Sequence, residues 1–524
     1  MKKLIFLFLI PIMIGQDAFS LTVNCTAGGL AAAVGTECTT VTNLTVTGVI
    51  DAQDFKTMKS GMPSLASIDL SGVSIAVYTG TGGPATSSSS VYAANTIPNA
   101  AFSNKNKLTS ITIPSSVTSI VDGAFTNCIG LTSISIPSSV TSIKSYAFDG
   151  CTGLTSITIP SSVTSIADGT FKNCIGLTVI SIPASVTSIK VATFSGCTGL
   201  TSIVIPSTVT SIESNAFYYC SGSTSISIPS SVTSIGSQAF MGCSGLITVD
   251  TANPTYSSID GVLYNKSKTT LIQCMTGKTG SYVIPSSVTS IVSYAFASCS
   301  GLTSLSIPTT VTSIGSNVFQ SCNGLTSITI PSSVTSIADG VFKGCSGLTS
   351  ITIPSSVTSI GGSSFNSCTS LTSITIPSSV TSITTGAFYN CTGLTSIYAN
   401  RTTPVDLSSS VMAFGNVNMT TCTLYVPIGS KAAYLAAVQW KDFTNIVETT
   451  TAVPTLSTSN VKVYTAQSSI LVEGTLMGET VSVYGLNGIQ LKCVKSQGER
   501  VTIPVSFKGV YLVKTQYETV KVVF

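Results

Sequence analysis

Hydrophobic and polar residues recur in a fixed order through most of the chain. In the unit that starts at Leu108, polar and apolar residues alternate over residues 110–113. Alternation at every second position predicts a short strand with Ile111 and Ile113 facing inward. Pro114 ends the strand, because proline has no N–H to donate to a ladder. The other inward positions predicted for this unit are Val117, Ile120, Phe125, Cys128 and Leu131.

The same unit returns every 23 residues. Later units begin at Leu131, Leu154, Leu177, Leu200 and Ser223, resume near Thr279, and continue at Leu302, Leu325, Leu348, Leu371 and Leu394. A single coil cannot bury its own apolar face, so successive coils must stack and pair their strands. We therefore predict a mainly β repeat solenoid over residues 65–447 with one continuous strand face. Residues 21–64 are expected to form the N-terminal cap over its first core layer.

The repeat is interrupted over residues 246–301. Two β-prone runs, at residues 262–264 and 271–272, flank a polar turn at residues 266–268. Two short runs on either side of a turn predict a β-hairpin. We expect this insert to belong to the stack and not to a separate domain.

The two ends of the chain differ from the repeat. Lys2 and Lys3 precede an apolar run over residues 4–14 and a polar stretch that ends at Ser20, which is typical of a secretory signal peptide over residues 1–20. No run reaches the length of about 20 apolar residues that a transmembrane helix needs. At the other end, a linker rich in Thr, Pro and Ser over residues 448–460 leads to alternating β-branched and aromatic runs over residues 461–524. These runs predict a small C-terminal β-sandwich.

Composition excludes several classes of function. Only 8% of the residues are charged, the net charge is +4, and no basic cluster is present, so nucleic acid is not an expected partner. The absence of histidine removes Ser-His-Asp and Cys-His catalysis and histidine metal sites. Asp122, Asp168 and Asp339 share one repeat position, but each precedes glycine, which favours a turn over a catalytic carboxylate pair. We predict no catalytic residue, no cofactor and no metal site.

Cysteine occupies the same apolar slot in each regular unit, as at Cys128 and Cys151. This spacing lacks the C-x-x-C pattern of metal and redox sites, and it favours a small buried apolar residue. Cys25 and Cys38 lie outside the repeat. Because exported proteins meet an oxidising environment, we predict a possible disulfide between these two.

The outward positions of the repeated strand carry hydroxyl groups, which would form two columns along one face of the stack. Solvent-facing strand positions accept small β-formers for structural reasons alone, but the columns are also the candidate binding face. The candidate residues are Ser110, Thr112, Ser133, Ser135, Ser156, Thr158, Ser327, Thr329, Ser350, Thr352, Ser373 and Thr375. Val179 and Val204 interrupt the columns, which makes an ice-binding surface a minor alternative.

The repeat L-x-x-I-x-I-P-x-x-V-x-x-I-x-x-x-A-F-x-x-C resembles the BspA-like class of bacterial leucine-rich repeats over about residues 97–447. The match includes the insert with Asp260, Gly261 and Tyr264, and a closing segment with Tyr434 and Trp440. The resemblance implies a leucine-rich-repeat solenoid whose residues 394–447 form the closing coil. It also implies a surface protein that takes part in adhesion.

The C-terminal segment carries a second resemblance. Residues 481–485 leading to Gly488, residues 509–513 and residues 520–523 look like the C-terminal sorting domain of type IX secretion cargo. This resemblance implies that residues 461–524 engage an export machinery, and that the protein is secreted or held on the outer surface of a Gram-negative bacterium.

These observations predict a monomeric, non-enzymatic binding or adhesion protein whose solenoid face holds an extracellular protein or glycan. The chief alternative is a carbohydrate-active enzyme with its site in the 246–301 insert, where Asp250 and Asp260 are the carboxylates to test. A purely structural surface protein is a further minor alternative.

Overall fold

The computed structural model describes residues 19–85 and 90–449 and, after these, seven strands between residues 462 and 523. The chain divides into two compact units, Met1–Glu448 and Thr449–Phe524. All of the predicted signal peptide except Phe19 and Ser20 lies outside the described residues, as does the linker from residue 450 to 460. Within the described part of the chain, no helix combines the length and apolar character needed to cross a bilayer.

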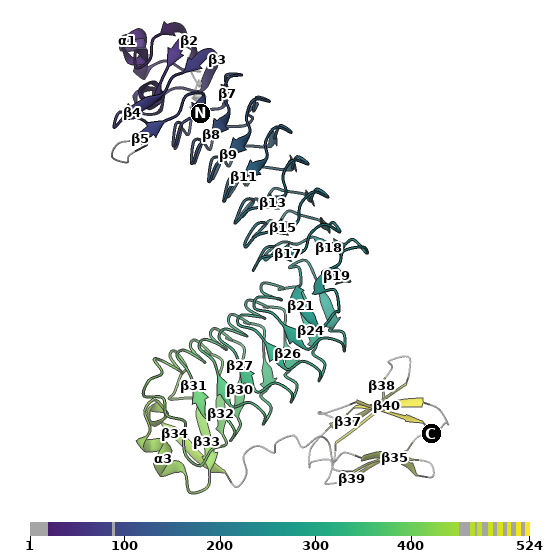
Figure 1. Cartoon of the computed structure of the whole chain (residues 1–524). Coiled ribbons are helices and arrows are strands. Elements are labelled where there is room, and N and C mark those ends of the chain that lie inside the picture. Colours follow the sequence, from purple (N-terminus) through teal and green to yellow (C-terminus); the bar gives the residue numbers. More distant parts are fainter. Residues whose placement is uncertain are drawn as a thin grey trace, which may run out of the picture. The chain divides into compact units, whose positions relative to one another are not determined.

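The first unit is a solenoid whose coils follow one another along the chain (Figure 1). In most of the regular coils the predicted strand pairs in parallel with its equivalent 23 residues away, for example Ser202 with Ser225. This row, which we call the outer ladder, confirms the predicted fold. Its strands are β1 (Ser20–Cys25), β2 (Asn43–Ile50), β3 (Ser67–Ile75), β7 (Ser110–Thr112), β10 (Ser156–Thr158), β12 (Val179–Ser181), β14 (Ser202–Val204), β16 (Ser225–Ile228), β18 (Leu246–Val249), β22 (Gly280–Val283), β24 (Leu302–Ser306), β26 (Ser327–Thr329), β28 (Ser350–Thr352), β30 (Ser373–Ile376), β32 (Ser396–Ala399), β33 (Thr423–Pro427) and β34 (Asn445–Thr449).

A second row of two-residue Ser-Ile strands, which we call the inner ladder, runs along the same coils. Within four groups, β6 to β11, β13 to β17, β23 to β25 and β27 to β31, each strand pairs in parallel with the next, as Ser119–Ile120 does with Ser142–Ile143. The sequence pattern did not predict this row, because two residues are too few to show alternation. Its strands are β6 (Thr96–Ile97), β8 (Ser119–Ile120), β9 (Ser142–Ile143), β11 (Ser165–Ile166), β13 (Ser188–Ile189), β15 (Ser211–Ile212), β17 (Ser234–Ile235), β23 (Ser290–Ile291), β25 (Ser313–Ile314), β27 (Ser336–Ile337), β29 (Ser359–Ile360) and β31 (Ser382–Ile383).

The predicted inward residues form the core. In the unit that starts at Leu108, all seven predicted positions from Ile111 to Leu131 are buried. Phenylalanine rings of successive coils stack with centroids 5.2 Å apart at Phe125 and Phe148. Each repeat cysteine is buried, and its thiol donates to the phenylalanine carbonyl of the preceding coil, as Cys151 Sγ does to Phe125 O at 3.1 Å. The exception is Cys299, which follows the insert and donates to the Met275 carbonyl at 3.5 Å. The cysteine is therefore a small core residue that also satisfies a buried carbonyl.

The N-terminal segment expected as a cap already forms coils of the outer ladder. Strand β1 pairs in parallel with β2, and β2 with β3. The return sides of these coils are helical, with α1 (Leu30–Val34), a 3-10 turn (Gly35–Thr39), α2 (Ala52–Lys56) and a π-type turn (Thr57–Gly61). A hairpin of β4 (Tyr78–Gly80) and β5 (Ser90–Tyr92) follows β3. At the other end of the unit, α3 (Lys431–Ala436) and a 3-10 turn (Trp440–Asp442) lie between β33 and β34.

The expected single continuous strand face is wrong, because both ladders are interrupted at the insert. The outer ladder stops at β18, which pairs only with β16, and resumes at β22. The inner ladder stops at β17. The buried side chains accordingly form two core clusters, one ending with Leu263 and Met275 and the other starting at Val262 and Tyr264. We call the coils before the insert the upstream stack and the coils after it the downstream stack.

The second unit consists of two antiparallel sheets. One contains β35 (Lys462–Ala466), β36 (Ser469–Glu473) and β39 (Arg500–Pro504); the other contains β37 (Thr480–Gly485), β38 (Gln490–Lys495), β40 (Val510–Lys514) and β41 (Thr519–Val523). Buried Ile470 and Val472 of the first sheet pack with Val481, Val483 and Val513 of the second. The two sheets therefore face one another as a β-sandwich.

Candidate binding surfaces

The candidate hydroxyl columns lie on the outer ladder in register. Ser327 pairs with Ser350 and Thr329 with Thr352, and isolated bridges join Ser135 to Thr112 and Thr158. All the predicted residues are exposed except Ser373 and Thr375, which are partly buried. Since paired strands lie about 4.8 Å apart, each column repeats its hydroxyl group at that spacing.

Most hydroxyl groups of these columns form no hydrogen bond to another residue in the described part of the chain. Among the candidate residues, only Ser110 forms a side-chain hydrogen bond to another described residue, with Ser67 at 3.0 Å. The threonine that precedes the strand behaves differently, because its hydroxyl donates to the preceding coil, as Thr155 does to the Thr132 carbonyl. The column hydroxyls are thus free to bond an external partner, whereas the neighbouring threonines contribute to the fold.

Apolar and aromatic residues occupy some positions of the hydroxyl columns. Val179, Val204 and Val283 are 59%, 68% and 70% exposed, although they occupy hydroxyl positions of the outer ladder. At the far end, Tyr398 and Tyr425 follow Thr375 in register, and their rings stack with centroids 4.6 Å apart. The surface therefore combines hydroxyl groups with isolated apolar contacts.

The insert contains the predicted hairpin and one additional strand. Strand β20 (Val262–Asn265) pairs antiparallel with β21 (Thr270–Gln273), which confirms the hairpin, and β19 (Tyr256–Ile259) pairs antiparallel with β20. Strand β21 then pairs in parallel with β23 and so starts the second part of the inner ladder. Strand β21 of the insert thus belongs to the first coil of the downstream stack.

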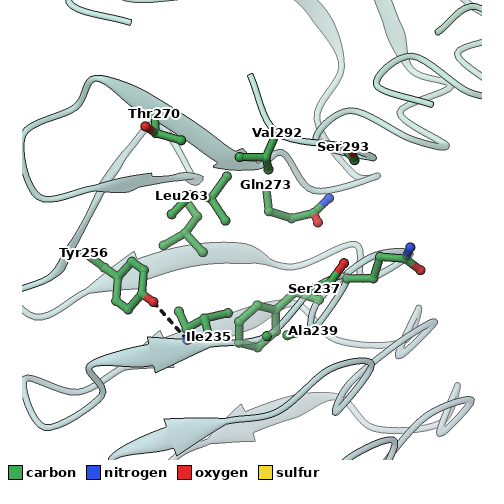
Figure 2. A pocket seen from close by; sticks show the side chains of 13 residues that line it. Ile235, Ser237, Ala239, Tyr256, Leu263, Thr270, Gln273, Val292 and Ser293 are labelled. Carbon is green, nitrogen blue, oxygen red and sulfur yellow. Dashed lines mark hydrogen bonds between the residues drawn. The ribbon is translucent and has the colours of Figure 1, made fainter. Parts of the chain in front are cut away.

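A cavity of about 450 Å³ lies where the inner ladder is interrupted, and we call it the coil gap. Residues 235–240 of the last upstream coil form one wall, and Val292 and Ser293 of the first downstream coil belong to the other (Figure 2). The insert supplies Tyr256, Leu263, Thr270, Ile272 and Gln273. No charged side chain lines the gap.

Tyr256 occupies the open edge of the inner ladder. The Ile235 N–H, which lies on the edge of β17 where no further strand pairs, donates to the Tyr256 hydroxyl at 2.9 Å (Figure 2). Burial raises the pKa of Tyr256. Near the gap, burial and the neighbouring phenols of Tyr219 and Tyr294 raise the pKa of Tyr218, and Tyr294 comes from the downstream stack. Several tyrosine side chains therefore lie close together where the upstream and downstream stacks meet.

The predicted disulfide is absent, since Cys25 and Cys38 are both free thiols in the structure. Cys25 lies at the end of β1 with its side chain in the core, where its thiol donates to the Val49 carbonyl at 3.8 Å. Cys38 is partly buried in the 3-10 turn after α1 and packs against the same core. Both thiols thus contribute to the packing of the first coils.

Three of the carboxylates considered for catalysis accept hydrogen bonds from nearby backbone N–H groups. Asp122 and Asp339 accept backbone N–H groups of the next coil, from Ser145 at 2.9 Å and from Gly362 at 2.6 Å. Asp250 is exposed and accepts the Ala252 N–H of its own turn. Neither Asp250 nor Asp260 lines the coil gap. Among the described residues, no group of three or more acidic, cysteine or histidine side chains is placed to hold a metal ion.

The comparisons with known proteins agree with the repeat geometry. The family model for the BspA type leucine rich repeat region matches residues 95–222, 164–279 and 274–395, which together exceed half of the chain. The chain belongs to the BspA-type leucine-rich-repeat family. No curated protein matches it.

Solved structures of leucine-rich-repeat proteins resemble this BspA-type chain. A leucine rich cell surface protein from Faecalibacterium prausnitzii is 36% identical, with a TM-score of 0.51 over 59% of this chain and 83% of that one. A leucine-rich repeat protein from Bacteroides ovatus is 27% identical over 73% of this chain and 92% of that one, with a TM-score of 0.41. The first similarity supports the fold over the greater part of the solenoid.

Proposed function

We propose that this BspA-type protein is a secreted or cell-surface binding protein that uses the hydroxyl columns of the outer ladder to hold a large extracellular partner, a protein or a glycan. The observation that carries the proposal is the set of in-register hydroxyl groups, most of which form no hydrogen bond to another described residue. The family and the similar structure of a cell surface protein support a role at the surface. Many weak contacts repeated at a fixed spacing add through multivalency.

A pair of charged substitutions tests the columns. Thr329→Arg with Thr352→Arg places two bulky charges on adjacent strands of the outer ladder. The matched control, Ser313→Arg with Ser336→Arg, places the same charges on exposed residues of the inner ladder. The full chain and both variants are applied to a glycan array and to immobilised extracellular-matrix proteins. We expect binding to fall about tenfold or more for the first variant only.

Two results would contradict this function. One is equal binding by both variants, which would place the binding surface elsewhere. The other is turnover of a glycan that is lost in Asp250→Asn or Asp260→Asn, which would identify the chain as a carbohydrate-active enzyme.

We further propose that the C-terminal β-sandwich directs export as a type IX sorting domain. The two-sheet architecture of residues 462–523 and the separation of this unit from the solenoid support the proposal. Deleting residues 461–524 is expected to trap the protein in the periplasm, as measured by fractionation and surface labelling. Normal surface display of the truncated chain would refute the assignment.

A further inference from the structure

The return side of each coil contains a regular set of backbone hydrogen bonds to the next coil. Three alternate N–H groups donate to three alternate carbonyls, for example Asn215 to Ser237 at 3.1 Å, Phe217 to Ala239 at 2.8 Å and Tyr219 to Met241 at 2.7 Å. The bonds of the preceding coil have the same form and direction, as Phe194 N–H to Ala216 O shows. All the donors of the upstream stack therefore point downstream.

This series stops at the coil gap. The next donors in the series are the N–H groups of Gln238, Phe240 and Gly242, and no described residue places an acceptor within hydrogen-bonding distance of them. The series resumes in the downstream stack, where Tyr294 donates to Ser316 at 3.0 Å and Phe296 to Val318 at 2.9 Å. The upstream stack therefore ends in three unpaired donors. Leaving such groups unpaired and buried is costly, and Phe240 is only 1% exposed.

The coil gap lies directly beside two of these donors, the N–H groups of Gln238 and Phe240, whereas Gly242 is not part of its lining. Gln238 and Phe240 belong to its lining, with the apolar side chains of Leu263, Ile272 and Val292 around them. The Ser293 carbonyl of the opposite coil accepts no hydrogen bond from a described residue. The gap thus offers donors on one wall, an acceptor on the other, and apolar surface between them. Its volume lies at the lower end of the range of ligand pockets, about 300–1,000 Å³.

We propose that the coil gap binds a short extended peptide segment of a partner protein, whose alternate backbone carbonyls accept the N–H groups of Gln238 and Phe240. The chain itself supplies the precedent, because at every regular coil these donors are paired by peptide carbonyls of two-residue spacing. When an extended peptide pairs with an open row of backbone groups, main-chain hydrogen bonds provide the affinity. We expect the bound peptide to carry small uncharged side chains, because the lining of the gap carries no charge.

A peptide matches this site better than a glycan. The alternate carbonyls of an extended peptide reproduce the two-residue spacing at which the equivalent donors are paired in every regular coil, and a sugar ring offers no such row of acceptors. The proposal goes beyond the hydroxyl columns, since it concerns a different surface and a different mode of binding. Failure of one therefore leaves the other standing.

The test uses a phage-displayed library of linear seven-residue peptides, selected on the full chain. Ser237 is an exposed residue of the gap lining, so Ser237→Trp fills the gap. The matched control is Val191→Trp, at the equivalent position two coils upstream, where a large side chain is already 38% exposed. Selected peptides are synthesised, and their affinities are measured by fluorescence anisotropy. We expect Ser237→Trp to weaken binding about tenfold or more, and Val191→Trp to leave it within about twofold.

Hydrogen exchange provides the second readout. In the free protein the amides of Gln238 and Phe240 should exchange faster than those of Asn215 and Phe217, and a selected peptide should protect them. The Thr329→Arg and Thr352→Arg variant should bind the peptides normally. The proposal is overturned if no peptide is selected, if Ser237→Trp binds the peptides as well as the wild type, or if oligosaccharides and not peptides protect these amides.

Discussion

The regular coils and the coil gap use the same backbone in opposite ways. In the upstream stack, phenylalanine rings from Phe102 to Phe240 follow one another at 5.2–5.6 Å, and every coil between the first and the last is hydrogen-bonded to both of its neighbours. At the gap the ring series stops, and it restarts at Phe296. In the regular coils, the backbone donors, the backbone acceptors and the apolar side chains are therefore all used in contacts with neighbouring coils. Capacity for binding remains on the outward side chains and where the repeat stops.

The largest expected effect comes from removing a ring within a regular stack. Phe194 is 1% exposed and lies between Phe171 and Phe217, at 5.6 and 5.3 Å. Phe194→Ala should destabilise the solenoid by about 3–5 kcal/mol, through lost burial and the cavity left behind. The midpoint of urea unfolding measures this. Val191→Ala, an exposed substitution of the same coil, is the control, and equal shifts for the two variants would contradict the account of the core.

A second prediction concerns the thiols that every regular coil buries. Burial raises the pKa of Cys345 to about 12 from 9.0. The folded state therefore favours the neutral thiol, so the contribution to stability is complete below about pH 9 and is lost as the pH rises toward 12. Each such thiol should cost about 1.4 kcal/mol for each pH unit within that window.

Unfolding midpoints between pH 7.5 and pH 10.5 check the thiol prediction. The wild type should become steeply less stable above about pH 9. Cys345→Ala should reduce the steepness, whereas Val341→Ala, a buried and non-titrating change in the same coil, should lower all midpoints and leave the pH dependence unchanged. A flat profile in the wild type would show that the thiols do not titrate during unfolding.

The sequence predicts the regular coils well, because each inward residue is repeated with its neighbours. Ile111 and Phe125 are recognisable from a period that the whole chain shares, and both are buried. The inner ladder was missed, since a Ser-Ile pair such as Ser119–Ile120 becomes a strand only through its neighbours in adjacent coils. Local patterns cannot show a strand defined by pairing alone.

The coil gap could be predicted only in part. The interrupted repeat indicates where the stack changes, and the hairpin of β20 and β21 is visible in the two β-prone runs that flank a polar turn in the insert. The unpaired donors at Gln238 and Phe240 are not visible, because these residues belong to a coil of ordinary sequence. What distinguishes them is the absence of a following coil at bonding distance. That absence depends on how the insert folds.

The smallest expected effect comes from removing a single hydrogen bond at the edge of the coil gap. Tyr256→Phe removes the hydroxyl that accepts the Ile235 N–H and leaves the edge of β17 without a partner at that position. The cost should be about 0.5–1.5 kcal/mol, the usual net value of one such bond. The Ile235 amide should exchange faster by about tenfold, while the amide of Ile212, which lies within a paired strand, should not change.

Tyr398→Phe is the control for this change, because the Tyr398 hydroxyl forms no hydrogen bond to a described residue and its ring remains stacked on Tyr425. It should alter neither stability nor the exchange of Ile235. If Tyr256→Phe left Ile235 exchange unchanged, another group or ordered water would have to satisfy that N–H. The edge of β17 would then be as fully paired as any regular coil, and the contrast between the coils and the gap would rest on Gln238, Phe240 and Gly242 alone.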